Sequence, residues 1–315
     1  MKKIKLLIII SIISLLLYFG YKVIGVRSFY AAKTIIKIRI PKVLAIIIAS
    51  GLVSISSYVF MVITDNRILT PSMLGFDSIY QGVHTLFIFI FGSISILNIP
   101  IYNFLISMVF MVGIVLILYK LVLNKKKNNL LFLLLIGLVV STFISSFISF
   151  IQSLMSPDEY LALASSMTVS LTNIEEELIY ISLPIFIILI FLFFRENKKY
   201  EVLQLGKDLS INLGIDYVKE VNKNLIYIAV AVSLATALVG PLSYLGLITV
   251  NIAKERLKSF NSKLIMIYSF LMGIIFIFLG SIIIDFIGLN TTISMIINLV
   301  GGIYLIYIIL KENKL

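Results

Sequence analysis

The sequence predicts an all-α integral membrane protein, a polytopic bundle of about ten transmembrane helices. Hydrophobic residues make up 60% of its 315 residues. Charged residues make up 13%, whereas a soluble domain would hold about a quarter. The 26 Lys and Arg residues gather in short segments, and the long stretches between these segments hold no charged residue.

Eight uncharged apolar stretches define the expected spans, because a bilayer core needs roughly 20 apolar residues per helix. They are residues 6–17, 43–63, 86–118, 130–151, 178–194, 225–252, 264–284 and 293–310. The two longest of these stretches have room for two short helices with a turn between them. Backbone groups in lipid must bond internally, and the stretches are far too long for barrel strands, so we expect helices. Residues 1–315 should form one transmembrane domain, with the first stretch kept as a helix rather than removed as a signal peptide.

Positive charge predicts the orientation, because cytoplasmic loops of membrane proteins are enriched in Lys and Arg. If both termini lie in the cytoplasm, 20 of the 26 basic residues also lie inside. The loop 153–177 then lies outside, and it carries five acids with no Lys or Arg. The sequence thus predicts a multi-pass protein of the cell membrane with cytoplasmic N- and C-termini.

Residues 22–42 depart from this bias, because they would lie outside and carry six basic residues and no acid. Arg39 and Lys42 stand closest to the second span. Such a basic segment attracts anions and acidic protein surfaces. Alternatively, it is an amphipathic segment whose cations meet lipid headgroups. The residues alone leave both interpretations open.

The longest cytoplasmic stretch is 195–224, which is nearly charge-balanced. Gly214 is predicted as the residue that ends a short helix begun near Gly206. Asp216 is then predicted to cap the next helix. Two short surface helices suit docking onto a cytosolic partner, and a plain solvated connector is the alternative.

A Gly-Pro pair interrupts the apolar stretch 225–252. Gly240 and Pro241 break the helix, because proline lacks the N–H donor and clashes with the preceding turn. Gly246 follows shortly after. Broken helices at membrane depth persist only where protein buries them or where they line a cavity. We expect a tight helical turn inside the bundle.

Hydroxyl side chains mark one face of the span 130–151. Ser141, Ser145 and Ser149 recur at intervals of four residues, so they share one helix face. Small hydroxyl residues also serve close helix packing. Packing and the lining of a pathway both remain open, and we predict the pathway.

Several kinds of chemistry are disfavoured by what the chain lacks. It has no cysteine and one histidine, His84, which we interpret as a packed, hydrogen-bonded residue rather than a ligand. No P-loop motif occurs. We expect no ionisable residue inside a span apart from Asp285 near a helix end, which disfavours an ion-driven carrier. We therefore expect no metal, cofactor or nucleic-acid partner, and a transporter powered by a partner chain rather than an enzyme.

Four motifs, taken in order, resemble the permease subunits of iron–siderophore and cobalamin ABC importers, the large type II importer family. They are RIPK at 39–42, DNRILTPSMLG at 65–75, the LG pairs at 205–206 and 213–214, and GPLSYLG at 240–246. Each motif is weak alone, but their order and the ten-span count together indicate the family. The segment PSMLGFDSIY at 71–80 resembles the branch that handles ferric catecholate siderophores.

The resemblance implies partners for this chain. Arg39 and Lys42 stand where the family places basic residues that meet an extracytoplasmic substrate-binding lipoprotein. The segment 203–220, called the coupling segment below, stands where the family rests on a dimer of cytosolic ATP-binding cassette ATPases. Its matching positions are Gly206, Asp208, Gly214 and Asp216. A second permease, identical or homologous, would complete the path through the membrane lipid.

Two departures from the family pattern stand out. The usual Arg-Asn-Pro after the second span is replaced by DNR at 65–67, and no basic residue lies between Lys263 and Lys311, where a third docking residue is often found. The implied function is import of a ferric siderophore, driven by a separate ATPase subunit. The alternatives are an ion-coupled secondary transporter and a membrane-embedded enzyme of lipid or polysaccharide chemistry.

Overall fold

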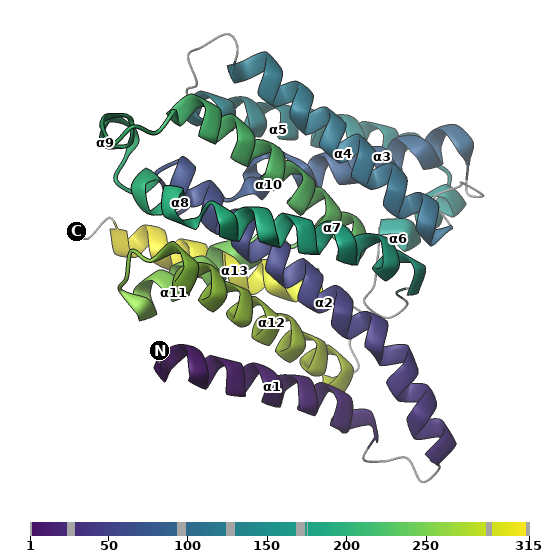
Figure 1. Cartoon of the computed structure of the whole chain (residues 1–315). Helices are drawn as coiled ribbons and strands as arrows, with labels where there is room; N and C mark the ends of the chain where they lie inside the picture. The colour runs from purple at the N-terminus through teal and green to yellow at the C-terminus, as the bar shows by residue number, and fades with distance from the viewer. Residues whose placement is uncertain are drawn as a thin grey trace.

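The computed structural model describes residues 2–23, 29–92, 99–123, 130–167, 174, 176–287 and 292–312, and the regular elements in these ranges are all helical. They are α1 (Lys2–Val23), α2 (Phe29–Ile63), the 3₁₀ turn η1 (Pro71–Leu74), α3 (Phe76–Phe91), α4 (Pro100–Leu123), α5 (Leu130–Leu154), α6 (Pro157–Met167), α7 (Glu176–Arg195), α8 (Asn197–Leu203), α9 (Lys207–Asn212), α10 (Tyr217–Val239), α11 (Leu245–Leu257), α12 (Ser262–Ile287) and α13 (Ile293–Glu312). The two chain ends and α9 lie at one end of the bundle (Figure 1), which we call the inner end, and the opposite end is the outer end.

Seven helices in the described ranges are long and apolar enough to span a membrane, namely α1, α2, α4, α5, α7, α10 and α12. The helices α3 and α13 are apolar but shorter. The thirteen-residue helix α11 follows the break after α10. The stretch 86–118 is divided between α3 and α4, and the stretch 225–252 between α10 and α11, as expected.

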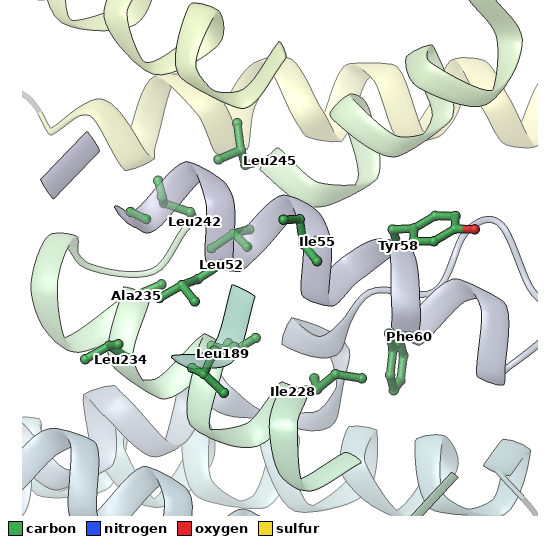
Figure 2. Packing of buried hydrophobic residues seen from close by; sticks show 14 of the residues in the cluster. Leu52, Ile55, Tyr58, Phe60, Leu189, Ile228, Leu234, Ala235, Leu242 and Leu245 are labelled. Atoms are coloured by element: carbon green, nitrogen blue, oxygen red, sulfur yellow. The ribbon is translucent and has the colours of Figure 1, made fainter. Parts of the chain in front are cut away.

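Helix α2 is the centre of the bundle. Of the 18 residues in its most apolar stretch, 94% are buried, and α1, α7, α10, α11 and α12 all pack against α2. Figure 2 shows part of this core, with side chains from α7, α10 and α11 gathered around Leu52 and Ile55. In contrast, only 17% of the α5 span is buried, so α5 offers most of its apolar surface to lipid or to another subunit.

Small residues bring the helices close to α2. A Cβ added at Gly246 on α11 would overlap the hydroxyl of Ser57 on α2. A Cβ at Gly273 on α12 would lie 2.7 Å from Oγ of Ser54. Thr249 donates a hydrogen bond of 3.2 Å to the same oxygen. Such close contacts between small and hydroxyl residues are how helices associate in lipid, where the hydrophobic effect does not drive them together.

The second helix begins fourteen residues before the stretch predicted from the sequence, at Phe29 rather than at residue 43. The charged segment before the span is therefore helical, and Pro41 lies inside the helix. The missing N–H of Pro41 removes one hydrogen bond without ending the helix. The hydropathy of the sequence predicted only the uncharged part of α2, residues 43–63. Hydropathy indicates which residues lie in lipid or in a core, but it does not show how far a helix extends beyond them.

Candidate functional site

The coupling segment begins at the last residue of the short helix α8 and contains the short helix α9, and both helices lie at the inner end of the bundle. Gly206 precedes α9 with φ of +93°, and Gly214 follows it with φ of +86°, a backbone region that favours glycine. The amide of Gly214 donates to the carbonyl of Ile211, and the amide of Ile215 donates to that of Ser210. This paired pattern is a Schellman motif, so the predicted end of the helix is confirmed.

The next helix starts as predicted. Asp216 accepts a hydrogen bond of 3.1 Å from the backbone N–H of Lys219, which makes it the N-cap of α10. Tyr217 then donates a hydrogen bond of 2.9 Å to the carbonyl of Ile63, the last residue of α2. The start of α10 is thus held to the inner end of the central helix.

Four charged side chains join the start of α8 to α10. Lys199 lies 2.8 Å from a carboxylate oxygen of Glu196 and 2.7 Å from one of Glu220. Lys223 contacts the same two acids at 3.2 and 2.5 Å. This charge network is a closed ring of two cations and two anions. Beside it, the buried Tyr200 donates a hydrogen bond of 2.7 Å to Asn224.

The network changes the protonation equilibria of its members. Burial disfavours the charged form of Glu196, but hydrogen bonds from Lys199 and Lys223 outweigh burial and hold the pKa of this carboxyl below its usual value. Hydrogen bonds to Glu196 and Glu220 raise the pKa of Lys199 above its usual value. Both shifts favour the charged forms, so Glu196 and Lys199 are ionised at neutral pH.

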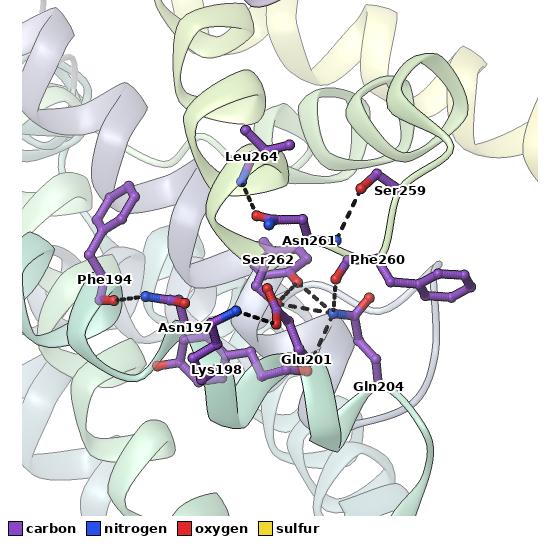
Figure 3. Close-up of polar contacts among 12 residues, drawn as sticks. Phe194, Asn197, Lys198, Glu201, Gln204, Ser259, Phe260, Asn261, Ser262 and Leu264 are labelled. Atoms are coloured by element: carbon purple, nitrogen blue, oxygen red, sulfur yellow. Dashed lines mark hydrogen bonds and ion pairs between the residues drawn. The ribbon is translucent and has the colours of Figure 1, made fainter. Parts of the chain in front are cut away.

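Gln204, between α8 and α9, ties the coupling segment to two other helices. Its amide donates hydrogen bonds of 3.1 Å to Ser262 Oγ and 3.3 Å to the carbonyl of Phe260 (Figure 3). The same amide lies 2.9 Å from the hydroxyl of Tyr58, which donates in turn to Ser262. A movement of α8 would therefore be transmitted to α2 and to the start of α12.

A cavity of about 380 Å³ opens at the inner end beside Gln204. The loop after α2, the last turn of α11 and the loop between α11 and α12 line it, and they supply Arg67, Lys254 and Lys258 against the single acid Asp65. Phe260 at its rim is 77% exposed. The cavity is suited to negatively charged groups on a partner.

The exposed surface of α9 carries mostly apolar side chains. Leu209 and Ile211 on the helix, and Leu205 and Leu213 at its two ends, are all about half exposed or more. Asp208 is exposed among them. Apolar side chains that cluster on a short surface helix indicate a protein contact, because isolated proteins rarely expose such groups together.

The predicted helix break lies where expected. α10 ends at Val239, Gly240 takes a φ of +84°, and α11 begins at Leu245. In the turn between these helices, Ser243 donates a short hydrogen bond to Asp77 at the start of α3. This contact joins the α10–α11 turn to the first turn of α3, directly after η1.

Asp77 corrects the expectation that Asp285 would be the only ionisable residue inside the bundle. It lies in the first turn of an apolar helix and packs against the α10–α11 turn. Asp77 lies between two of the uncharged stretches from which the spans are predicted, so the sequence does not place it inside a helix. The charge network was also missed, although its E-x-x-K spacings at 196–199 and 220–223 predict ion pairs on a helix.

The three serines of α5 have different surroundings. Ser141 is half-buried, donates a hydrogen bond of 2.8 Å to the carbonyl of Gly137 and packs against Gly75. Ser145 is exposed and pairs with Ser78 on α3 at 3.2 Å. Ser149 is exposed and bonds within its own helix. Ser141 thus serves packing, while Ser145 and Ser149 present hydroxyl groups on an open face.

His84 is a packed residue, as interpreted from the sequence. It is buried, its Nε2 lies 3.2 Å from the hydroxyl of Ser107, and its ring lies 4.4 Å from that of Tyr80. Within the described residues, no three His, Cys, Asp or Glu side chains gather in a way that would hold a metal ion.

From Phe29 on, the outer basic segment is part of α2. Arg39 is only 4% exposed, because it pairs with Asp285 at 3.4 Å and lies over the ring of Tyr18 at 4.4 Å. Lys33 and Lys37, six and two residues before Arg39, are exposed, and Lys42 is half-buried. Arg27 and the lysines at 125–127 lie outside the described residues.

Comparison with known proteins decides the family. The FecCD transport family matches residues 6–311. The chain belongs to the FecCD transport family. Within it, the chain is 43% identical to the petrobactin import system permease protein YclO of Bacillus subtilis over 88% of each chain. It is 32% identical to the petrobactin import system permease protein FatC of Bacillus anthracis, over 89% of this chain and 80% of the relative.

A solved structure supports the fold of this FecCD-family chain. It is an inward-facing conformation of a metal-chelate type ABC transporter, with a TM-score of 0.83, 18% identity and coverage of 98% of this chain and 99% of the other. The resemblance to iron–siderophore importer permeases, drawn from four short motifs, is therefore confirmed.

Proposed function

We propose that this FecCD-family chain is the permease subunit of an ABC importer that carries a ferric siderophore into the cytoplasm. The observation that carries the proposal is the coupling segment together with α8: ion pairs and hydrogen bonds fix α8 and Gln204 to the bundle, while the apolar side chains of α9 are exposed. The names of the two relatives point to petrobactin or a chelate of similar chemistry. Residues 1–315 then act as one transmembrane domain.

The structure supports a route for force from a cytosolic ATPase pair. Closure of the ATPases on bound ATP would move α8 and α9, with Asp208 on α9 and Gly206 and Gly214 at its two ends. The charge network passes this movement to α10, and Gln204 passes it to α2 and α12. Because α10 leads into the break at Gly240 and Pro241, the movement reaches the interior of the bundle.

A second permease would pack against the exposed side of this chain. The α5 span buries little of its surface within the chain, and Ser145 and Ser149 place hydroxyl groups on it. Two copies, or this chain and a homologue, would enclose a path between them. Specificity for the chelate would come mainly from the binding protein.

The binding protein would dock on the outer end of α2. Lys33 and Lys37 are the exposed cations there, while the ion pair with Asp285 keeps Arg39 inside the bundle. We therefore expect Lys33→Glu with Lys37→Glu to weaken stimulation of ATPase activity by the binding protein, and more so at low ionic strength. Arg39→Glu should instead disturb the packing of α1, α2 and α12. Unchanged stimulation in the double lysine variant would remove the docking proposal.

One experiment tests the proposal as a whole. The tagged chain is purified from its native host in mild detergent, the associated chains are identified by mass spectrometry, and uptake of radioactive ferric petrobactin is measured after reconstitution with ATP. We expect a stoichiometric P-loop ATPase, and uptake that requires ATP and the binding protein. A chain that purifies alone and transports with only an ion gradient would establish the secondary transporter instead.

A further inference from the structure

The cavity beside Gln204 at the inner end carries an excess of positive charge. Arg67, Lys254 and Lys258 line it against Asp65, so three cations and one acid leave a net charge of +2. Among the described residues, none of the three cations forms an ion pair with an acid. Their charges are therefore available to a bound anion.

Lys254 shows that this charge is unfavourable without a counter-ion. It lies half-buried in the last turn of α11, with its Nζ 5.8 Å from the centre of the Tyr58 ring. Burial, and next the positive charge of Arg67, lower the pKa of Lys254 to about 8, and Asp65 offsets these two causes only in part. Lys254 is still protonated at neutral pH, and a bound anion would relieve its repulsion with Arg67.

The backbone around the cavity is unusual as well. Asp65 has a φ of +49° and Lys258 a φ of +48°, and they are the non-glycine residues with positive φ in the described part of the chain. Both line this one cavity. Lys258 follows the end of α11, where glycine is the usual residue in this conformation. Backbone conformations of this kind gather at functional sites, so a lysine at this position indicates a use for its cation.

Hydrogen bonds fix the backbone that carries the cations. Asn251 on α11 donates a hydrogen bond of 3.0 Å to the carbonyl of Arg67, which joins the loop after α2 to α11. The amide of Lys258 donates one of 3.0 Å to the carbonyl of Lys254. The side chains of Arg67 and Lys258 are themselves exposed. A ligand can therefore reach them without any opening of the bundle.

The charge and the type of these side chains select a phosphate group as the ligand. A guanidinium donates two parallel hydrogen bonds to phosphate oxygens, and a lysine binds phosphate as a point charge. A phosphate monoester carries a charge of about −1.5 to −2 at neutral pH, which matches the net charge of the cavity better than a single carboxylate does. The volume of about 380 Å³ lies in the usual range for sites of small ligands.

We propose that this cavity binds a phosphate group, of inorganic phosphate or of an anionic lipid headgroup, through Arg67, Lys254 and Lys258. The site lies apart from the transport of a chelate and does not rest on the function proposed above. A bound phosphate group would join the loop after α2 to the loop before α12. Gln204 ties the coupling segment to these same two helices, so the ligand would stabilise the inner end of the bundle.

The absence of cysteine from the chain makes a direct test practical. Ser259→Cys places one thiol in the lining of the cavity, and Asn222→Cys places one at an exposed position of α10 outside it. The full chain is purified in detergent, and maleimide labelling is measured in inorganic phosphate and in sodium chloride of equal ionic strength. We expect phosphate at ten times its Kd to slow labelling of residue 259 about 10-fold relative to chloride, and to leave residue 222 unchanged.

Vesicles separate the two sources of the phosphate group. The same two variants are reconstituted in phosphatidylcholine alone and in phosphatidylcholine with cardiolipin, without dissolved phosphate. Slower labelling of residue 259 in the cardiolipin vesicles would assign a lipid headgroup. Slower labelling in phosphatidylcholine alone, once inorganic phosphate is added, would assign the free anion. Either result supports the site.

Lys258→Gly separates binding from folding, because it removes a cation and also suits the positive φ. In the Ser259→Cys background it should raise the Kd of the phosphate source about 10-fold, the effect of one charge-assisted hydrogen bond. The thermal unfolding temperature should not fall, because glycine adopts this conformation without strain. Arg67→Gln should weaken binding to a similar extent. Lys263→Gln is the matched control, since it removes an exposed cation of α12 that does not line the cavity.

Four results would overturn the inference. Equal slowing by chloride would show screening rather than binding, and no slowing by phosphate or by cardiolipin would show that no such site exists. Slowing that requires the ATPase subunit would assign the cavity to acidic side chains of that partner. Equal losses in Lys258→Gly and Lys263→Gln would show attraction by the whole basic surface. None of these results changes the uptake experiment, so the site and the proposed function are tested separately.

Discussion

At the scale of single residues, the close packing of the bundle depends on glycines, which have no Cβ. Gly246 and Gly273 lie against hydroxyl residues of α2, at distances that leave no room for a Cβ. Helices in lipid gain little from burying apolar groups against one another, so close van der Waals contact has to hold them together. The central position of α2 follows from its row of small side chains.

Gly246→Ala should therefore loosen α11 from α2. The new methyl group would overlap the Ser57 hydroxyl, and overpacking of this kind lowers the free energy of unfolding by about 1–3 kcal/mol. Thermal unfolding in detergent measures the change. Gly302→Ala is the control, because a Cβ there meets no atom within 4 Å. Ser57→Gly combined with Gly246→Ala should restore part of the loss, and equal effects of the two alanine variants would contradict this account.

A second prediction at this scale concerns charge. The pKa of Glu196 is lowered in the folded protein, so its ionised form stabilises the fold above the usual glutamate value of 4.5, and this contribution is lost as the pH falls through the lower folded value. Glu196→Gln should reduce stability at neutral pH by about 1 kcal/mol and should flatten the dependence on acid pH.

Unfolding measured at pH 7 and near pH 3 tests this. Glu201→Gln is the control, because Glu201 pairs with the highly exposed Lys198 and should contribute little. If Glu196→Gln follows the same pH curve as the wild type, the charge network does not stabilise the fold through this residue.

At the scale of elements, the coupling segment is the best-predicted part of the chain and the outer end of α2 the worst. Gly214 and Asp216 belong to local rules for ending and starting helices, and such rules need only neighbouring residues. The pairing of Arg39 with Asp285 joins residues 246 positions apart, and a single sequence does not reveal such a pair. Asp77 was missed for the same reason, since its partner Ser243 lies on a distant turn.

The end of α9 should control the coupling of ATP hydrolysis to uptake. Gly214 is exposed and meets no atom within 4 Å, so a larger residue would not clash there. Its positive φ nevertheless penalises a side chain by about 1–2 kcal/mol, most of all a branched one. Gly214→Val should displace α9 and lower the chelate taken up per ATP hydrolysed. Gly214→Asn should retain most coupling, because asparagine tolerates this conformation, and normal uptake by the valine variant would exclude the role.

At the scale of the whole molecule, the two ends of the bundle carry different functional features. The inner end gathers the termini, the coupling segment and a basic cavity. The outer end carries the exposed lysines of α2. The helix break joins α10 to α11. A lack of buried carboxylates disfavours an ion-driven carrier, but Asp77 is a carboxylate inside the bundle. The family and the coupling segment now favour the ATP-driven importer.

The ten-span arrangement predicted from the sequence, with six spans before α9, places both termini and α9 on the same side of the membrane. Because the chain has no cysteine, single thiols report the side directly. We expect Asp208→Cys to react with a membrane-impermeant maleimide only in inside-out vesicles, and Thr34→Cys only in right-side-out vesicles, since both positions are exposed in the structure. Lys5→Cys should behave like Asp208→Cys. Reaction of residues 5 and 208 from opposite sides would contradict the ten-span arrangement, and reaction of both from outside would reverse the orientation that the positive charges predict.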